Sequence, residues 1–190
     1  FNKMPTQSLK DSGWIEVICG SMFSGKTEEL IRRLRRAKIA KQSVGIYKLK
    51  IDSRFSPHHI VSHSQLSMAS EIVQSADEII KKSQQKEVVG IDEAQFFEDP
   101  LVDICSELAN KSKRVIVAGL DKDFRGKPFD PIPKLLAEAE YITKTLAICV
   151  LCGSPAGFSQ RLSTDRTQIL LGEKGNYEAR CRKCFIPPQN

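Results

Sequence analysis

Eight residues near the start of the chain have the composition of a phosphate-binding loop. The segment 20–27 has the sequence GSMFSGKT and fits the pattern G-x-x-x-x-G-K-[ST]. Glycine allows positive φ angles, so consecutive backbone N–H groups can curl around phosphate oxygens. In this pattern the lysine reaches the β- and γ-phosphates and the final hydroxyl binds Mg²⁺. The sequence therefore predicts a nucleotide site made of Gly20, Ser21, Met22, Phe23, Ser24, Gly25, Lys26 and Thr27.

Two carboxylates directly follow a second apolar segment, 87–91. An apolar strand that delivers Asp-Glu to its carboxyl end is the Walker B arrangement of phosphoryl-transfer proteins. We expect Asp92 to hold Mg²⁺ together with Thr27, directly or through water. We expect Glu93 to accept a proton from the attacking hydroxyl, as a general base. The alternative interpretation is two surface acids at the end of a strand.

A further charged pair, Asp52 and Arg54, follows the predicted strand 43–50. In open α/β sheets the ligand lies at the carboxyl ends of the strands. A guanidinium suits phosphate oxygens, and a carboxylate suits hydrated Mg²⁺. We therefore expect this pair to be well placed for a ligand, and an exposed local ion pair is an equal alternative.

The cysteines are of two kinds. Cys19 and Cys105 lie in apolar segments and are predicted to be core thiols. The other four form two C-x-x-C pairs, which match a closed tetrahedral Zn²⁺ site of structural type. We predict that the zinc ligands are Cys149, Cys152, Cys181 and Cys184. The segment between the pairs is a long loop held at both ends by metal, and such loops often carry function.

The elements that position these residues alternate between strand and helix up to residue 147. This alternation predicts an α/β fold of the P-loop NTPase type, with a mostly parallel sheet and helices on both faces. Residues 75–78 have a capping-box pattern at the start of a helix. Predicted strands are 14–19, 43–50, 67–71, 87–91, 114–118 and 141–147, and predicted helices are 27–40, 75–82, 101–112 and 132–139.

We predict three parts: a flexible tail, 1–12; a P-loop domain, 13–147; and a small zinc-binding domain, 148–190. The net charge of +6 suits an anionic ligand such as ATP, with nucleic acid as a second possibility. No apolar run is long enough for a membrane span, and no secretion signal is visible, so we expect a cytoplasmic protein.

A loop with the sequence GLDKDFRGKPF, 119–129, opens from the strand 114–118 at the ligand edge. Phe124 and Phe129 in this loop could stack on a base or line an apolar pocket. Ordinary core packing is equally compatible with their positions, and the composition leaves this choice open.

Taken together, these motifs resemble the thymidine kinases of cellular type (type II), which carry a zinc-containing lasso domain. The resemblance spans 13–185 and includes GSMFSGKT, ELIRRLRR, IDSR, GIDEAQFF, GLDKDFRGKPF and the two cysteine pairs. It implies transfer of the γ-phosphate of ATP to the 5′-hydroxyl of thymidine or deoxyuridine, giving dTMP in nucleotide salvage and DNA precursor synthesis. Ser21 stands where many members have proline, and Gly175 where an acidic residue is usual.

The resemblance also implies roles for individual residues. Glu93 matches the catalytic base, and Asp92 and Gln95 belong to the same motif on the ATP side. The base pocket and the lasso would be formed by Met22, Phe96, Leu120, Phe124, Phe129, Gln168, Ile169, Leu170, Leu171, Gly172 and Tyr177. The expected assembly is a homotetramer with feedback binding of dTTP, and no membrane or nucleic-acid partner is expected.

The residues alone leave two other classes of function open. One is a nucleic-acid-stimulated ATPase, because DEAQ resembles helicase Walker B sequences and zinc ribbons often bind nucleic acid. Against this interpretation, we do not expect a second motor domain within a chain of 190 residues. The other is a module that binds ATP without turning it over.

Overall fold

A six-stranded parallel sheet forms the centre of the computed structural model, which describes residues 12–50, 59–61, 67–163 and 176–188. The strand order is β5-β2-β6-β7-β1-β8, and every neighbouring pair is parallel. All six strands therefore end at one edge of the sheet. The strands are β1 (Trp14–Gly20), β2 (Val44–Leu49), β5 (Glu71–Val73), β6 (Val88–Ile91), β7 (Arg114–Leu120) and β8 (Tyr141–Thr145).

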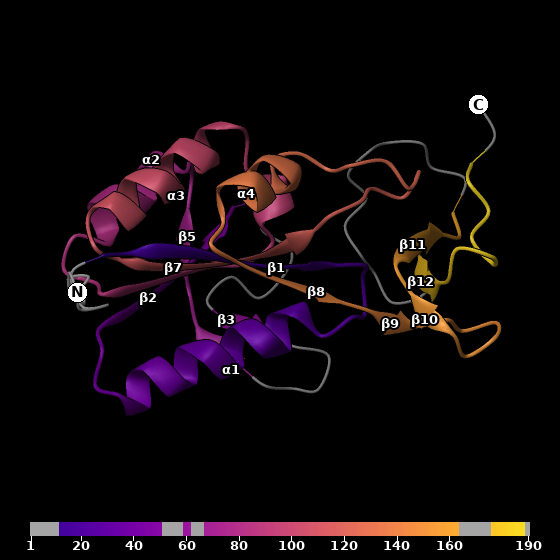
Figure 1. The fold of residues 1–190 in the computed structure, drawn as a ribbon, viewed down its shortest axis with the longest axis horizontal. Coiled ribbons are helices and arrows are strands. Elements are labelled where there is room, and N and C mark those ends of the chain that lie inside the picture. Colours follow the sequence, from indigo (N-terminus) through magenta and orange to yellow (C-terminus); the bar gives the residue numbers. More distant parts are fainter. Residues whose placement is uncertain (1–11, 51–58, 62–66, 164–175, 189–190) are drawn as a thin grey trace, which may run out of the picture.

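Helices cover both faces of this sheet, as predicted (Figure 1). Helix α1 (Lys26–Ile39) lies on one face, and α2 (Asp77–Lys82), α3 (Pro100–Asn110) and α4 (Ile132–Glu138) lie on the other. Side chains alternate between the faces because successive strand residues point in opposite directions. Ile18 belongs to the core under α1, whereas its neighbour Val17 belongs to the core under the other three helices.

A close approach between α1 and β6 brings the two predicted nucleotide motifs together. A Cβ atom added to Gly90 would lie 2.8 Å from Cδ1 of Leu34, which is fully buried on α1. A larger residue at this position would push the helix away from the sheet. The missing side chain therefore lets the middle of α1 pack closely against β6.

Three local expectations differ from the structure. The predicted strand 67–71 is two strands: β4 (Ser67–Ala69), which pairs with β3 (His59–Val61), and β5, which joins the main sheet. The predicted strand 141–147 divides, because residues 147–148 leave the sheet to form β9 (Ala147–Ile148). The capping-box prediction is wrong, because Ala76 is the N-cap of α2 and no side chain caps this helix.

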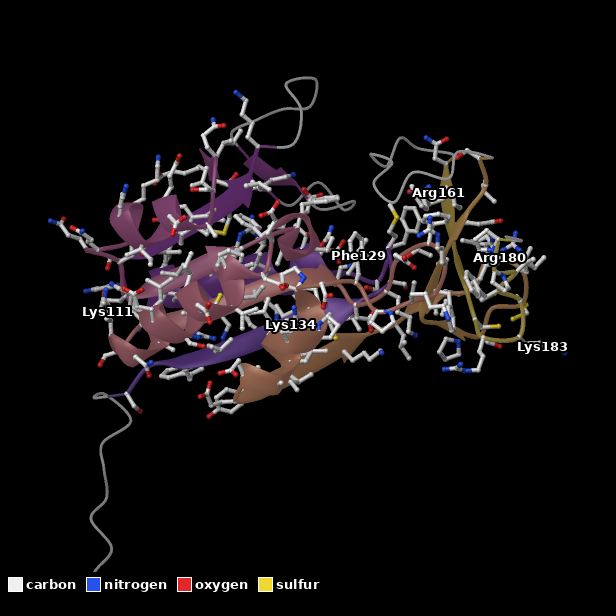
Figure 2. All side chains as sticks on the ribbon, turned by 90° about the horizontal axis from the view of Figure 1, so that it is seen from above. Lys111, Phe129, Lys134, Arg161, Arg180 and Lys183 are labelled. Atoms are coloured by element: carbon white, nitrogen blue, oxygen red, sulfur yellow. The ribbon has the colours of Figure 1, made fainter. Side chains whose placement is uncertain are left out.

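The C-terminal unit, residues 147–163 and 176–188, lies beyond the carboxyl ends of the sheet strands (Figure 1). It contains the antiparallel pairs β9 with β10 (Pro155–Ala156) and β11 (Phe158–Arg161) with β12 (Tyr177–Arg180). Figure 2 shows Phe129 between the sheet and this unit. The rings of Phe158 and Phe185 stack with 4.6 Å between centroids, close against Gly126 of the 119–129 loop.

Some predicted features lie outside the described residues. They are most of the N-terminal tail, Asp52, Arg54 and the lasso residues Gln168, Ile169, Leu170, Leu171 and Gly172. Among the helices that the structure describes, none is long and apolar enough to cross a membrane.

Candidate active site

The predicted phosphate loop connects β1 to α1 and has the backbone angles that such a loop requires. Gly20 has φ of 149° and Gly25 has φ of 83°. A Cβ atom on Gly20 would lie 2.2 Å from the carbonyl oxygen of Thr145, so only glycine allows this approach. Phe23 also has a positive φ, 63°, which is uncommon for a residue with a side chain. The loop therefore stores some backbone strain next to the helix N-terminus, where anions bind favourably.

Hydrogen bonds hold the loop in this shape. The Ser24 hydroxyl lies 2.7 Å from the carbonyl oxygen of Ser21 and 2.8 Å from the hydroxyl of Thr145 on β8. The ammonium of Lys26 donates to the same carbonyl of Ser21, at 2.6 Å. Burial lowers the pKa of Lys26 to about 8, although Asp92 and Asp121 favour its charged form. A phosphate in the loop would add negative charge and favour the charged lysine further.

The two residues predicted to bind Mg²⁺ lie against one another. The hydroxyl of Thr27 donates to Asp92, with oxygens 3.3 Å apart. Asp92 is buried, and burial followed by the charge of Glu93 raises its pKa to about 6. Oxygen donors of this kind are the ligands that Mg²⁺ takes in proteins, together with substrate phosphates. The pair therefore suits the metal that the sequence predicts.

Glu93 is held next to this pair in a left-handed backbone conformation. Its φ is 52°, and the short helix η1 (Ala94–Phe96) begins directly after it. Its backbone N–H donates to the Asp92 carboxylate at 3.0 Å, and its own carboxylate lies 2.8 Å from the ammonium of Lys48. Burial is the largest single influence on Lys48 and lowers its pKa, but the charge and hydrogen bond of Glu93 and the charge of Asp92 together outweigh burial, so the pKa is raised.

A cavity of about 370 Å³ brings these groups together. The phosphate loop forms one wall, and Asp92, Glu93, Gln95 and Leu120 also line it. The side-chain carbonyl of Gln95 accepts a hydrogen bond from the backbone N–H of Leu120, at 3.0 Å. This bond fixes the end of β7 against the segment that carries the carboxylates.

The residues predicted for the base pocket fall into two groups. Met22 and Leu120 line the cavity, whereas Phe96, Phe124 and Phe129 are not among its lining residues. Phe124 lies under the guanidinium of Arg161, which is 3.6 Å from the ring centroid and also donates to the hydroxyl of Tyr177 at 2.6 Å. Phe124 and Tyr177 are thus joined through an arginine of β11.

Sequence reasoning missed several contacts of the site. The backbone N–H of Met22 donates to Ser159 at 3.0 Å, and the Ser21 hydroxyl donates to the carbonyl of Ala156 at 3.2 Å. These contacts join the phosphate loop to the C-terminal unit across more than 130 positions, and no local pattern signals them. For Lys48 the sequence offers one indication of a role in the site, because this residue lies near the carboxyl end of the predicted strand 43–50.

The four cysteines of the two C-x-x-C pairs form one cluster. Their Sγ atoms all lie within 4.8 Å of one another, and those of Cys152 and Cys181 are 3.6 Å apart. Zn–S bonds of about 2.3 Å in a tetrahedron place sulfurs about 3.8 Å apart, so the cluster fits zinc. The pKa of Cys149 is lowered to about 6, mainly because its sulfur accepts a hydrogen bond from the backbone N–H of Cys181. The lowered pKa favours the thiolate, the form of cysteine that binds metal.

The parallel sheet, the glycine-rich loop at its carboxyl edge and the threonine–aspartate pair define a P-loop nucleotide-binding protein. Within this class, the chain belongs to the thymidine kinase family, because the family model "Thymidine kinase" matches residues 13–185.

Curated relatives agree with this assignment. The chain is 56% identical to a thymidine kinase of Rhodothermus sp. (strain ITI 518), over 93% of this chain and 83% of that protein. It is 52% identical to a thymidine kinase of Bacteroides thetaiotaomicron, over 98% of this chain and 94% of the relative. A thymidine kinase of Bacteroides fragilis is 51% identical, over 97% and 93% of the two chains.

Proposed function

We propose that this protein is a kinase that transfers the γ-phosphate of ATP to the 5′-hydroxyl of thymidine, giving dTMP. One observation carries the proposal beyond family membership: a carboxylate lies in the same cavity as the phosphate loop and next to the Thr27–Asp92 pair. The position of Glu93 in the lining of this cavity supports its assignment as the general base. An ATP-binding module without turnover has no need of this group.

Most of the catalytic effect in phosphoryl transfer comes from alignment and charge neutralisation. The backbone N–H groups of the loop and the Lys26 ammonium bind the β- and γ-phosphates. Thr27 and Asp92 would hold Mg²⁺, which supplies positive charge to the phosphates when it is bound. Glu93 accepts the proton of the 5′-hydroxyl as that oxygen attacks the γ-phosphorus.

The nucleoside is assigned to the side of the cavity next to the C-terminal unit. Met22 and Leu120 are assigned to the base, and their position in the lining of the cavity beside the phosphate loop supports this assignment. The family resemblance supports the assignment of Phe124 and Tyr177, which are joined through Arg161, to the same pocket, together with Phe96 and Phe129. The family resemblance supports parallel assignments for Asp52 and Arg54 on the ATP side and for Gln168, Ile169, Leu170, Leu171 and Gly172 on the nucleoside side. Phosphoryl transfer is thus assigned to residues 13–147, and residues 148–190 form the zinc-binding part.

A nucleoside panel tests this function. We expect thymidine, and deoxyuridine among its analogues, to yield the monophosphate when ATP and Mg²⁺ are supplied, and we expect EDTA to abolish the reaction. Product analysis by chromatography separates nucleoside phosphorylation from simple ATP hydrolysis. If DNA or RNA stimulates ATP hydrolysis and no nucleoside monophosphate forms, the protein is a nucleic-acid-stimulated ATPase instead.

Self-association is a second part of the proposal, with a homotetramer as the expected state in a reducing cytoplasm and dTTP as a feedback ligand. The open edge strand β8 supports association, since Tyr141 and Ile142 on it are each 55% exposed. We expect light scattering to give a mass of four times 21.3 kDa.

The edge strand is tested by Ile142→Lys, which should yield smaller species because a charge on the contact face opposes pairing. Ile186→Lys is the control, since Ile186 is exposed but lies outside the sheet. A monomer mass for the unmodified protein would contradict the assembly.

A further inference from the structure

We propose that Lys48 is a positioning residue for phosphoryl transfer, which fixes the carboxylate of Glu93 within the cavity. The inference rests on the proposed role of Glu93 as the base. Lys48 lies outside the recognised nucleotide motifs, and its ammonium is 2.8 Å from the Glu93 carboxylate. The ion pair therefore joins two neighbouring strands at the edge where the reaction takes place.

The backbone of Lys48 is held rigidly. Strand β2 lies between β5 and β6 in the sheet, and Lys48 itself is paired in register with Ile72 of β5. On the other side, Tyr47 is paired with Ile91, and its carbonyl accepts the N–H of Asp92 at 3.1 Å. Lys48 and Glu93 therefore each directly follow a residue of this hydrogen-bonded pair, Tyr47 and Asp92, and the lysine ammonium extends from a fixed backbone position.

The Glu93 side chain has enough freedom that a partner is needed to fix its direction. It follows the end of β6, its backbone is left-handed, and its side chain is 38% exposed. A glutamate with this freedom samples several rotamers, of which few point at an acceptor hydroxyl. Among the described residues, Lys48 is the cation that pairs with this carboxylate.

The lysine that lines the cavity, Lys26, has a different partner. The Lys26 ammonium donates to the carbonyl of Ser21 inside the phosphate loop, at 2.6 Å. The two lysines thus have different roles: Lys26 binds the phosphates, and Lys48 positions the general base, Glu93. This division predicts that Lys48 acts through Glu93 and adds nothing once Glu93 has lost its function.

A double-mutant cycle tests the proposal. We expect Lys48→Met to lower kcat about tenfold, with the KM values for ATP and thymidine changed less than about twofold. Lys48→Arg should recover most of the rate, because a guanidinium can make the same ion pair. In a Glu93→Gln background, Lys48→Met should leave kcat unchanged. The control is Lys82→Met, which breaks an exposed pair with Glu71 at 3.2 Å and should leave all three constants unchanged.

Two results would overturn the proposal. One is a raised KM for ATP at constant kcat, which would make Lys48 a phosphate ligand. The other is a further loss of rate when Lys48→Met is added to Glu93→Gln. A nearly normal rate for Glu93→Gln alone would instead refute the role of Glu93 as the general base. This result therefore distinguishes a failure of the proposed function from a failure of the proposal for Lys48. If thermal unfolding shows that Lys48→Met does not fold, Lys48→Gln replaces it and carries the same expectations.

Discussion

Glu93→Gln is expected to reduce thymidine phosphorylation by at least about a hundredfold, the scale on which general-base catalysis contributes. Glutamine has the shape of glutamate, so the left-handed turn at this position and the short helix after it should persist. The amide cannot accept the proton of the 5′-hydroxyl. Replacement also breaks the ion pair with Lys48, which was 2.8 Å long in the intact site.

Affinity for ATP should change little in this variant, because the phosphate loop and the Thr27–Asp92 pair are unaltered. Single-turnover kinetics give the chemical rate, and calorimetry with a non-hydrolysable ATP analogue gives the affinity. Glu98→Gln is the matched control, because Glu98 is an exposed glutamate a few residues further along the chain and should retain full activity. If the rate of Glu93→Gln is within a few-fold of that of the unmodified protein, Glu93 is not the general base.

Cys149→Ser and Cys181→Ser should each release the zinc ion and unfold much of the C-terminal unit. We expect the zinc content to fall from about one ion per chain to nearly none, because structural zinc supplies a large part of the folding free energy of such small units. Both cysteines are buried, and a serine hydroxyl does not replace a thiolate as a zinc ligand. The small cluster of alanines around them offers little apolar surface to compensate.

Elemental analysis measures the zinc content, and hydrogen exchange shows whether strands β9 to β12 remain folded. Protection should be lost in these strands and retained in the parallel sheet. Cys105→Ala is the control, since Cys105 is a buried thiol of α3 far from the cluster and its loss should not release zinc. The assignment of the cluster to zinc fails if the intact protein, purified without chelators, contains none.

The sequence predicted the parts of this fold that depend on local pattern. The phosphate loop, the buried strand before Asp92 and the two cysteine pairs are each visible within a few residues. Their meeting at one edge follows from parallel strands, whose carboxyl ends lie together. The order of the strands does not follow from local pattern, because it depends on which apolar faces pair across the whole chain. For the same reason, β5 was not predicted to be an edge strand of the sheet.

The remaining features of the site depend on contacts between distant segments. Nothing around Phe124 indicates that an arginine 37 positions later covers its ring, so the choice between pocket and packing was open. Ser159 has no motif, and its contact with Met22 exists only because the C-terminal unit folds back onto the phosphate loop. Lys48 is an ordinary strand lysine until β2 and β6 are placed side by side.

The hydrogen bonds from Ser21 and Met22 to the C-terminal unit have a consequence for protein engineering. Because the ATP-binding loop and the zinc-binding segment are in direct contact, we expect that neither segment can be replaced independently by that of a relative. A chimera that takes one segment from another member must also take the residues that meet at Ala156 and Ser159. Without this match, a graft intended to alter nucleoside choice will also alter the affinity for ATP.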